Sequence, residues 1–134
     1  MIAKLEVIHY PLDGGSWETE SLATPSLEAV HEEIRTMDPF AKPIATLLQN
    51  PDITDGSLMM LNGGNDLYHV QIADEDACWI QAFDPSGSEE DVQVWSSDQG
   101  FSCARKLTWN LDTTLDLVRH YFLNQSPHPG YSWE

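Results

Sequence analysis

The hydrophobic pattern is strongest near the C-terminus, where apolar residues recur with helical spacing. They stand four, three and four residues apart: Leu111, Leu115, Val118 and Phe122. This spacing places them on one face of a helix, and Asn110 or Asp112 can cap its first turn. Pro127 prevents the helix from continuing, so we expect a helix over residues 111–123.

A second helical pattern occupies the N-terminal half, after Thr24 and Pro25, since proline suits the first helical position. Its apolar positions are Leu27, Val30, Ile34 and Met37, and Asp38-Pro39 must end it. Before it, residues 4–10 alternate and predict a strand. Residues 17–23 are polar and ambiguous, at most a short extension. Residues 42–48 are compatible with a half-buried turn or a short helix.

From Ser57 onward the apolar residues alternate with period two, which is typical of strands. The expected strands cover residues 58–62, 68–72, 78–83, 92–95 and 101–109. Gly63-Gly64-Asn65-Asp66 favours a tight hairpin between the first two, because these residues readily take positive φ. Five strands with short turns indicate an antiparallel meander. We therefore predict one α+β domain spanning residues 1–134, with a sheet of five to six strands and two main helices covering one face.

The composition fits a single globular domain, with 134 residues and 41% hydrophobic residues. The N-terminus lacks the pattern of a signal peptide, and no apolar run is long enough to span a bilayer. The two cysteines, Cys78 and Cys103, have no disulfide or zinc spacing. We therefore expect a cytoplasmic protein with reduced thiols. Cys78 alternates with Ile80 and Ala82, which predicts a buried structural thiol.

The charge is far from balanced, with 22 Asp and Glu against six Lys and Arg and a net charge of −16. Such a chain repels nucleic acid and anionic membranes, so neither is expected as a direct ligand. It attracts basic proteins and accelerates encounters with them. Charge alone is also compatible with a simple role in solubility.

The sequence contains no recognisable catalytic motif. The five histidines are scattered without metal-binding spacing. We expect His31 on the solvated side of the first helix, and His69 either facing solvent or as a polar packing residue. Carboxylates are too abundant for any pair to be informative. The prediction is therefore a protein that is not an enzyme and has no metal or cofactor.

Aromatic residues are the other unusual feature, because five tryptophans are many for this length. Trp79 alternates with Gln81 and Phe83, opposite to the face that carries Ile80, so both faces of that strand bear apolar groups. Trp79, Trp95 and Trp109 fit either packing or a surface for a protein partner. For Tyr131 and Trp133, in a tail broken by proline and glycine, we favour a role beyond core packing.

Several of these features occur together in a known family. Leu61-Asn-Gly-Gly64, the helix around residues 115–123 and the ending Pro129-Gly-Tyr-Ser-Trp133-Glu134 resemble the Imm-one family of bacterial immunity proteins. The resemblance covers residues 57–134. It implies a non-enzymatic antitoxin that binds the cognate domain of a polymorphic or contact-dependent toxin, often a nucleic-acid deaminase or nuclease, and blocks its active site.

A toxin domain that acts on nucleic acid needs a positive cleft, which an acidic inhibitor can occupy by charge complementarity. The candidate interface residues are Asp74, Glu75, Asp76, Asp84, Glu89, Glu90, Asp91, Tyr131, Trp133 and Glu134. Two alternatives stay open: an acidic adaptor or nucleic-acid mimic that regulates a host DNA-binding protein, and a small hydrolase with a carboxylate pair. Whether the free protein forms homo-oligomers is not predicted.

Overall fold

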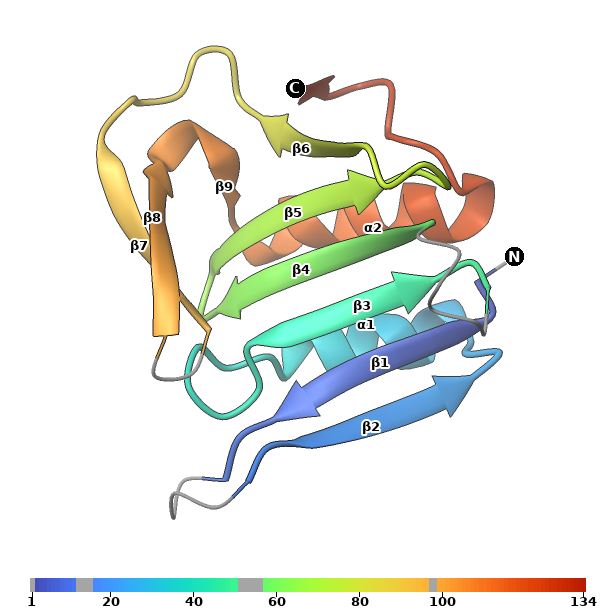
Figure 1. The fold of residues 1–134 in the computed structure, drawn as a ribbon. Helices are drawn as coiled ribbons and strands as arrows, with labels where there is room; N and C mark the ends of the chain where they lie inside the picture. Colours follow the sequence, from blue (N-terminus) through green and yellow to red (C-terminus); the bar gives the residue numbers. More distant parts are fainter. Residues whose placement is uncertain (1, 12–15, 51–56, 97–98) are drawn as a thin grey trace.

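The computed structural model describes residues 2–11, 16–50, 57–96 and 99–134. Within them an eight-stranded antiparallel sheet carries two helices on one face, α1 (Leu27–Arg35) and α2 (Leu111–Asn124) (Figure 1). The strands are β1 (Lys4–His9), β2 (Glu18–Ala23), β3 (Ile44–Leu48), β4 (Leu58–Gly64), β5 (Leu67–Ala73), β6 (Trp79–Phe83), β9 (Thr108–Trp109) and β10 (Ser132–Trp133). The α+β class and the helices on one face of a meander are confirmed.

The strand order across the sheet is β10-β6-β5-β4-β3-β1-β2, and β9 pairs with β5. The β4–β5 hairpin forms at the expected place. Asn65 and Asp66 make its turn with φ of 53° and 67°, and Gly63 and Gly64 precede them with φ of 118° and 141°. Asp66 also accepts a hydrogen bond from the backbone N–H of Leu111 (2.7 Å), which fixes the start of α2 against this hairpin.

The core lies between the sheet and the two helices. Its largest fully buried side chains include Leu5, Val30, Ile34, Leu47, Met59, Leu61, Tyr68, Val70, Leu117 and Tyr121. The buried face of α2 is rotated from the expected one, because Thr114 and Tyr121 are buried while Leu111 and Phe122 lie at its margin. Both polar groups are satisfied: the Thr114 hydroxyl donates to the Asn110 carbonyl (2.7 Å), and the Tyr121 hydroxyl accepts from Gln49 (2.9 Å).

Side-chain caps fix where the helices begin. Asn110 Oδ1 accepts the Thr113 N–H (2.9 Å), as predicted. In α1 the cap is Ser26, whose Oγ accepts the Ala29 N–H (3.1 Å), so Pro25 precedes the cap instead of opening the helix. The predicted opening at Thr24-Pro25 is therefore two positions too early. Gln125, with φ of 51°, ends α2.

Two segments that the sequence left open are full strands. The pattern of residues 42–48 is compatible with a turn or short helix, but β3 is a central strand between β1 and β4. Its residues Ala45 to Leu48 are buried on both faces, and a strand buried in this way loses the alternation that identifies strands. β2 was missed for the opposite reason, since this edge strand is exposed and polar on both faces.

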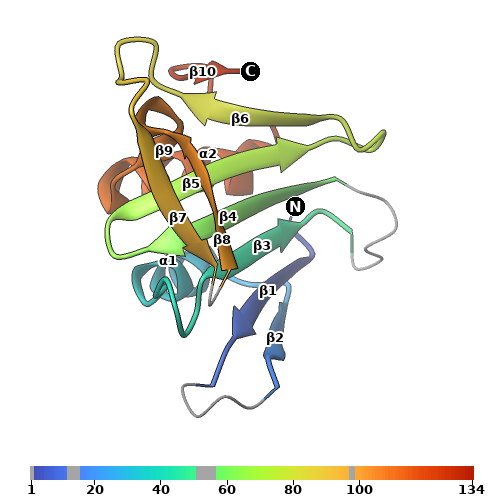
Figure 2. The same cartoon turned by 60° about the vertical axis from the view of Figure 1, so that its left-hand side comes forward.

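The last two strands of the expected meander leave the main sheet. β7 (Asp91–Ser96) and β8 (Gln99–Ala104) form a separate hairpin that crosses β4 and β5 on the face opposite to the helices (Figure 2). The outer edge of β6, where β7 would have paired, is instead occupied by β10. Val94 of β7 is fully buried. The Phe101 ring of β8 packs edge-on against His69, and the two ring centroids lie 5.1 Å apart.

Of the two histidines considered in the sequence, His31 is less exposed than expected, and His69 matches one of its two alternatives. His31 was placed on the solvated side of α1, but it lies at the contact with α2, where its Nε2 is buried and burial lowers the pKa of the ring. His69 is 5% exposed and hydrogen-bonded to Gln81 (2.7 Å), so it is the polar packing residue of the two alternatives. The contact with α2 buries His31, and the β7–β8 hairpin covers His69.

We expect the His69 ring to titrate below its ordinary pKa of 6.5, because burial disfavours the imidazolium more than the hydrogen bond to Gln81 favours it. Because the folded-state pKa is lowered, the unfolded chain binds more protons at His69 than the folded protein does. The stability that His69 contributes is therefore fully present above pH 6.5 and is lost as the pH falls from 6.5 through the lower pKa of the folded protein. Ring NMR shifts followed against pH would measure the midpoint. A midpoint above 6.5 would contradict the burial of this ring.

Candidate functional site

The acidic turn between β5 and β6 holds three of the predicted interface residues, Asp74, Glu75 and Asp76, and all three are exposed. Asp74 Oδ1 accepts the N–H groups of Asp76 and Cys78, each at 2.9 Å. The Asp74 carboxylate thus holds the turn together, as aspartate commonly does in turns. Glu75 and Asp76 form no side-chain bond within the described part of the chain, so their charges are free to act on a partner.

A cleft of about 430 Å³ lies beside this acidic turn. Its walls come from the turn, from the inner strands and from the end of α2, and they include Asp74, Glu75, Asp76, Cys78, Tyr121, Gln125 and Pro127. Burial raises the pKa of the Tyr121 phenol, which stays neutral and hydrogen-bonded to Gln49. The cleft therefore joins an acidic rim to a neutral, partly apolar floor, a combination that suits a long basic side chain.

Cys78 is exposed, which contradicts the prediction of a buried structural thiol. The strand begins at Trp79, so Cys78 belongs to the turn, where Asp74 binds its N–H. The alternation with Ile80 and Ala82 therefore did not extend back to it. Trp79 is 46% exposed on the face opposite to the helices, which leaves an aromatic ring beside the acidic turn.

We expect Cys78 to react with a thiol reagent about tenfold faster than Cys103 at neutral pH, because the thiolate must be both formed and reached. Cys103 is half-buried, and burial together with the nearby Asp91 carboxylate raises the pKa of its thiol. Stopped-flow labelling of Cys78→Ser and Cys103→Ser would separate the two rates. Equal rates would show that the two thiols are equally accessible.

In the second acidic segment, residues 84–91, two of the four carboxylates face cations of the same chain. Glu89 pairs with Lys106 (2.8 Å), and Glu90 lies 3.9 Å from Arg105. The Glu89 carboxylate raises the pKa of Lys106, and Glu134 adds to this, so Lys106 serves two of the predicted interface carboxylates. These surface pairs contribute little stability, but they reduce the field that a partner meets.

Asp84 and Asp91 flank that paired region. Asp84 Oδ1 accepts from the N–H (3.0 Å) and the hydroxyl (2.8 Å) of Ser86, so it shapes its own turn. Asp91 opens β7 opposite Ala104 and is exposed. Of this segment, Asp91 is the carboxylate with neither a cation nor a turn bond in the described residues.

Tyr131 and Trp133, for which we favoured a role beyond packing, are docked on the domain. Trp133 pairs with Ala82 in β10, and its indole N–H donates to the His128 carbonyl (3.1 Å). Tyr131 packs on Trp109 and donates to Asp116 (2.9 Å). Both rings are half-buried against the core, so the C-terminal tail forms an edge of the sheet.

Strand β6 joins the two acidic segments along the chain, and the C-terminal tail pairs with it through β10. The acidic turn lies at one end of β6 and Asp84 follows the other end, and the five residues of β6 span about 16 Å as an extended strand. β10 runs along the outer edge of β6, where the backbone of Glu134 exchanges hydrogen bonds of 2.8 and 3.0 Å with Gln81. The structure thus gathers these residues at one end of the sheet (Figure 1), with two acidic segments separated by the docked tail.

Sequence reasoning missed an aromatic pair on the face that carries the hairpin. Phe40 and Trp95 are 53% and 39% exposed, and their ring centroids lie 5.7 Å apart. Phe40 follows α1 and Trp95 belongs to β7, so their contact depends on the hairpin crossing the sheet. The sequence offers no signal for it beyond the number of tryptophans.

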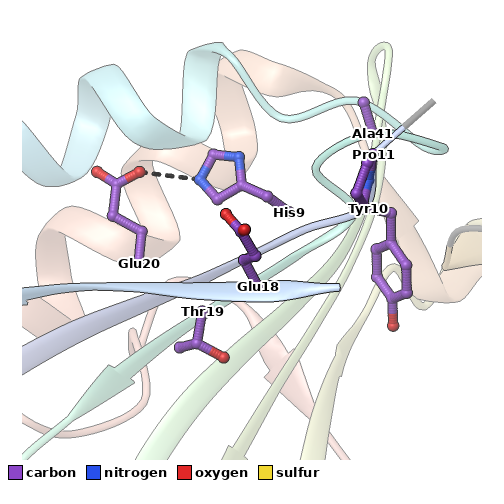
Figure 3. A pocket seen from close by; sticks show the side chains of 7 residues that line it. All are labelled: His9, Tyr10, Pro11, Glu18, Thr19, Glu20 and Ala41. Atoms are coloured by element: carbon purple, nitrogen blue, oxygen red, sulfur yellow. Dashed lines mark hydrogen bonds and ion pairs between the residues drawn. The ribbon is translucent and has the colours of Figure 1, made fainter. Parts of the chain in front are cut away.

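The hydrolase alternative requires two converging carboxylates, and Glu18 and Glu20 line one cleft together. They line a cleft of about 680 Å³ with His9, which is bonded to Glu20 (2.9 Å) (Figure 3). Both carboxylates are exposed on an edge strand, whereas a carboxyl that acts as general acid near neutral pH is usually buried in an apolar site. The described residues include no cluster of three metal-binding side chains. No helix in the described ranges has the length and apolar character to span a membrane.

Comparison with known proteins adds information about the fold. No protein-family model matches the sequence, and no curated protein matches it. The crystal structure of a hypothetical protein from Neisseria gonorrhoeae is similar, with a TM-score of 0.60 and 12% identity over 94% of this chain and 90% of that one. At this identity the likeness shows a shared fold across nearly the whole chain.

Proposed function

We propose that the protein is an immunity protein, which binds a cognate toxin domain with a basic surface in a one-to-one complex and blocks its active site. The family resemblance of residues 57–134 suggests this class. The likeness to the gonococcal protein concerns the fold alone, which it extends over nearly the whole chain.

The observation that carries the proposal is the unpaired charge of Glu75 and Asp76 on the rim of a cleft. The chain has six lysines and arginines. Four of them are held in ion pairs: Lys4 with Glu6, Lys42 with Glu33, Arg105 with Glu90, and Lys106 with Glu89. The other two, Arg35 and Arg119, lie near His31. The positive charge is therefore engaged away from the β5–β6 turn.

A lysine or arginine of the toxin would enter the cleft beside this turn. Its charged group would meet the carboxylates of Glu75 and Asp76, while its aliphatic stem would lie against Tyr121 and Pro127, which also line the cleft. Trp79, at the start of β6, is exposed on the opposite face of the sheet and would serve as an aromatic contact for the toxin surface around that basic residue. A nucleic-acid-cleaving or deaminating enzyme has such basic groups in its substrate cleft, which explains how binding would inhibit it.

We expect this protein to rescue growth of cells that express the toxic C-terminal domain of the secreted protein encoded beside its gene. The two purified proteins should elute together in a one-to-one complex, and the toxin's activity should fall to zero at one equivalent. An equal amount of this protein should leave an unrelated toxin active. Capture of a housekeeping DNA-binding factor instead would favour the adaptor alternative and contradict the proposal.

A further inference from the structure

We propose that the outer edge of β2 accepts an extended, basic segment of another protein as an added strand. This edge lies at the opposite end of the sheet from β6 and the acidic turn (Figure 1). The inference does not rest on the proposed function, because it follows from the backbone and charges of β2. Strand addition to a free edge is a general mode of peptide recognition, in which backbone hydrogen bonds supply affinity.

The free hydrogen-bonding groups of this edge can be assigned. The N–H of Thr24 donates to the Ala3 carbonyl (2.8 Å), so this residue points toward β1. Backbone groups alternate in direction along a strand, and the register pairs Leu5 with Leu22 and Val7 with Glu20. The N–H and C=O groups of Thr19, Ser21 and Ala23 therefore point outward, and β2 is the last strand at this end of the described sheet.

The side chains of β2 are unusually accessible for a strand. All but Leu22 are exposed, and Trp17, immediately before the strand, is 58% exposed. Glu18 and Glu20 project on the helix side, whereas Thr19 projects on the other (Figure 3). The edge thus presents alternating acidic and hydroxyl groups, next to the cleft of about 680 Å³ that contains both glutamates.

Charge complementarity selects the occupant. A basic strand would place lysine or arginine directly opposite Glu18 and Glu20, and opposite charges in cross-strand pairs attract. A second copy of this chain, paired antiparallel about Thr19, would instead place Glu18 of each molecule opposite Glu20 of the other, between molecules of net charge −16. Like charges facing each other across strands are destabilising, and charged edges commonly prevent self-association. The same glutamates therefore oppose a homodimer and favour a basic partner.

The probe is a short synthetic peptide in which lysine and valine alternate. On adding it to the whole protein, we expect the amide NMR signals of Thr19, Ser21 and Ala23 to shift and their hydrogen exchange to slow. Ser21→Pro removes an outward N–H that β1 does not use, and should weaken binding about tenfold, whereas Ser21→Ala should bind normally. Thr19→Pro is the second variant if Ser21→Pro fails to fold, which loss of amide protection in α2 would report.

Two controls separate strand addition from mere attraction of a cation. The same peptide with an N-methyl group on every residue keeps its charge but has no backbone N–H to donate from either edge, so it should leave these amides unchanged. A Glu75→Lys/Asp76→Lys variant should still bind the peptide, because the acidic turn is not part of this edge. Equal binding of the methylated peptide, or undiminished binding to Ser21→Pro, would overturn the proposal. Self-association through β2 without peptide would overturn the choice of occupant.

Discussion

Replacing Gly63 with alanine is expected to destabilise the protein by about 3 kcal/mol or more, a large part of the 5–15 kcal/mol that is typical of a domain. A Cβ on Gly63 would lie 2.2 Å from the carbonyl oxygen of Leu67, which belongs to the paired strand β5. The backbone φ of 118° is also a value that residues with a side chain rarely adopt. The Gly63 N–H donates to the Pro43 carbonyl (2.9 Å), so the backbone is fixed on both sides and has little freedom to relax.

Gly130→Ala is the matched control for this substitution. At Gly130 the nearest atom to an added Cβ is Cε1 of the His128 side chain (2.9 Å), and a side chain can turn away where a backbone carbonyl cannot. Urea denaturation of both variants would measure the difference in unfolding free energy. If the two alanine variants lost equal stability, the close approach of Gly63 to the Leu67 carbonyl would not be the cause of the loss.

Reversing the charge of Glu75 and Asp76 is expected to slow association with the toxin domain by about tenfold at low salt, because steering by local charge acts on the association rate. The double variant Glu75→Lys/Asp76→Lys leaves Asp74 intact, since that carboxylate binds the N–H groups of Asp76 and Cys78 and holds the turn. The fold should therefore be retained. Surface plasmon resonance or stopped-flow fluorescence would give the rates.

The control for this prediction is Glu89→Lys/Glu90→Lys, which changes the net charge by the same amount. Its carboxylates are already engaged by Lys106 and Arg105, so we expect a smaller loss of association rate. Equal losses for the two double variants would mean that net charge alone steers the encounter. In that case the cleft beside the β5–β6 turn would have no special part in binding.

Strong periodicity made part of the fold predictable. The meander from β4 to β6, the β4–β5 turn and the two helices followed from alternation and helical spacing in the sequence. β2 and β3 were not recognised because one is polar on both faces and the other is buried on both, and neither condition produces alternation. The departure of β7 and β8 from the sheet depends on β10 occupying the edge of β6, a contact between distant parts of the chain.

The sequence predicted which residues of the candidate surface are acidic and exposed, but not which of them are paired with cations. The acidic residues of both segments are exposed or half-exposed, as turn residues usually are. Sequence could not show that Lys106 and Arg105 face two carboxylates of one segment, because the chain must first fold the β7–β8 hairpin back to bring them near Glu89 and Glu90. It also could not show that Tyr131 and Trp133 dock beside β6, since their pattern fits a free tail equally well.

The most direct test is to measure, as a function of ionic strength, how this protein associates with the toxin domain that we propose as its partner. The account predicts one-to-one binding whose association rate falls steeply as salt rises, with loss of toxin activity in the complex. An association rate that does not change with salt, or a complex in which the toxin stays active, would contradict the claim that an acidic surface of this protein blocks a basic active site.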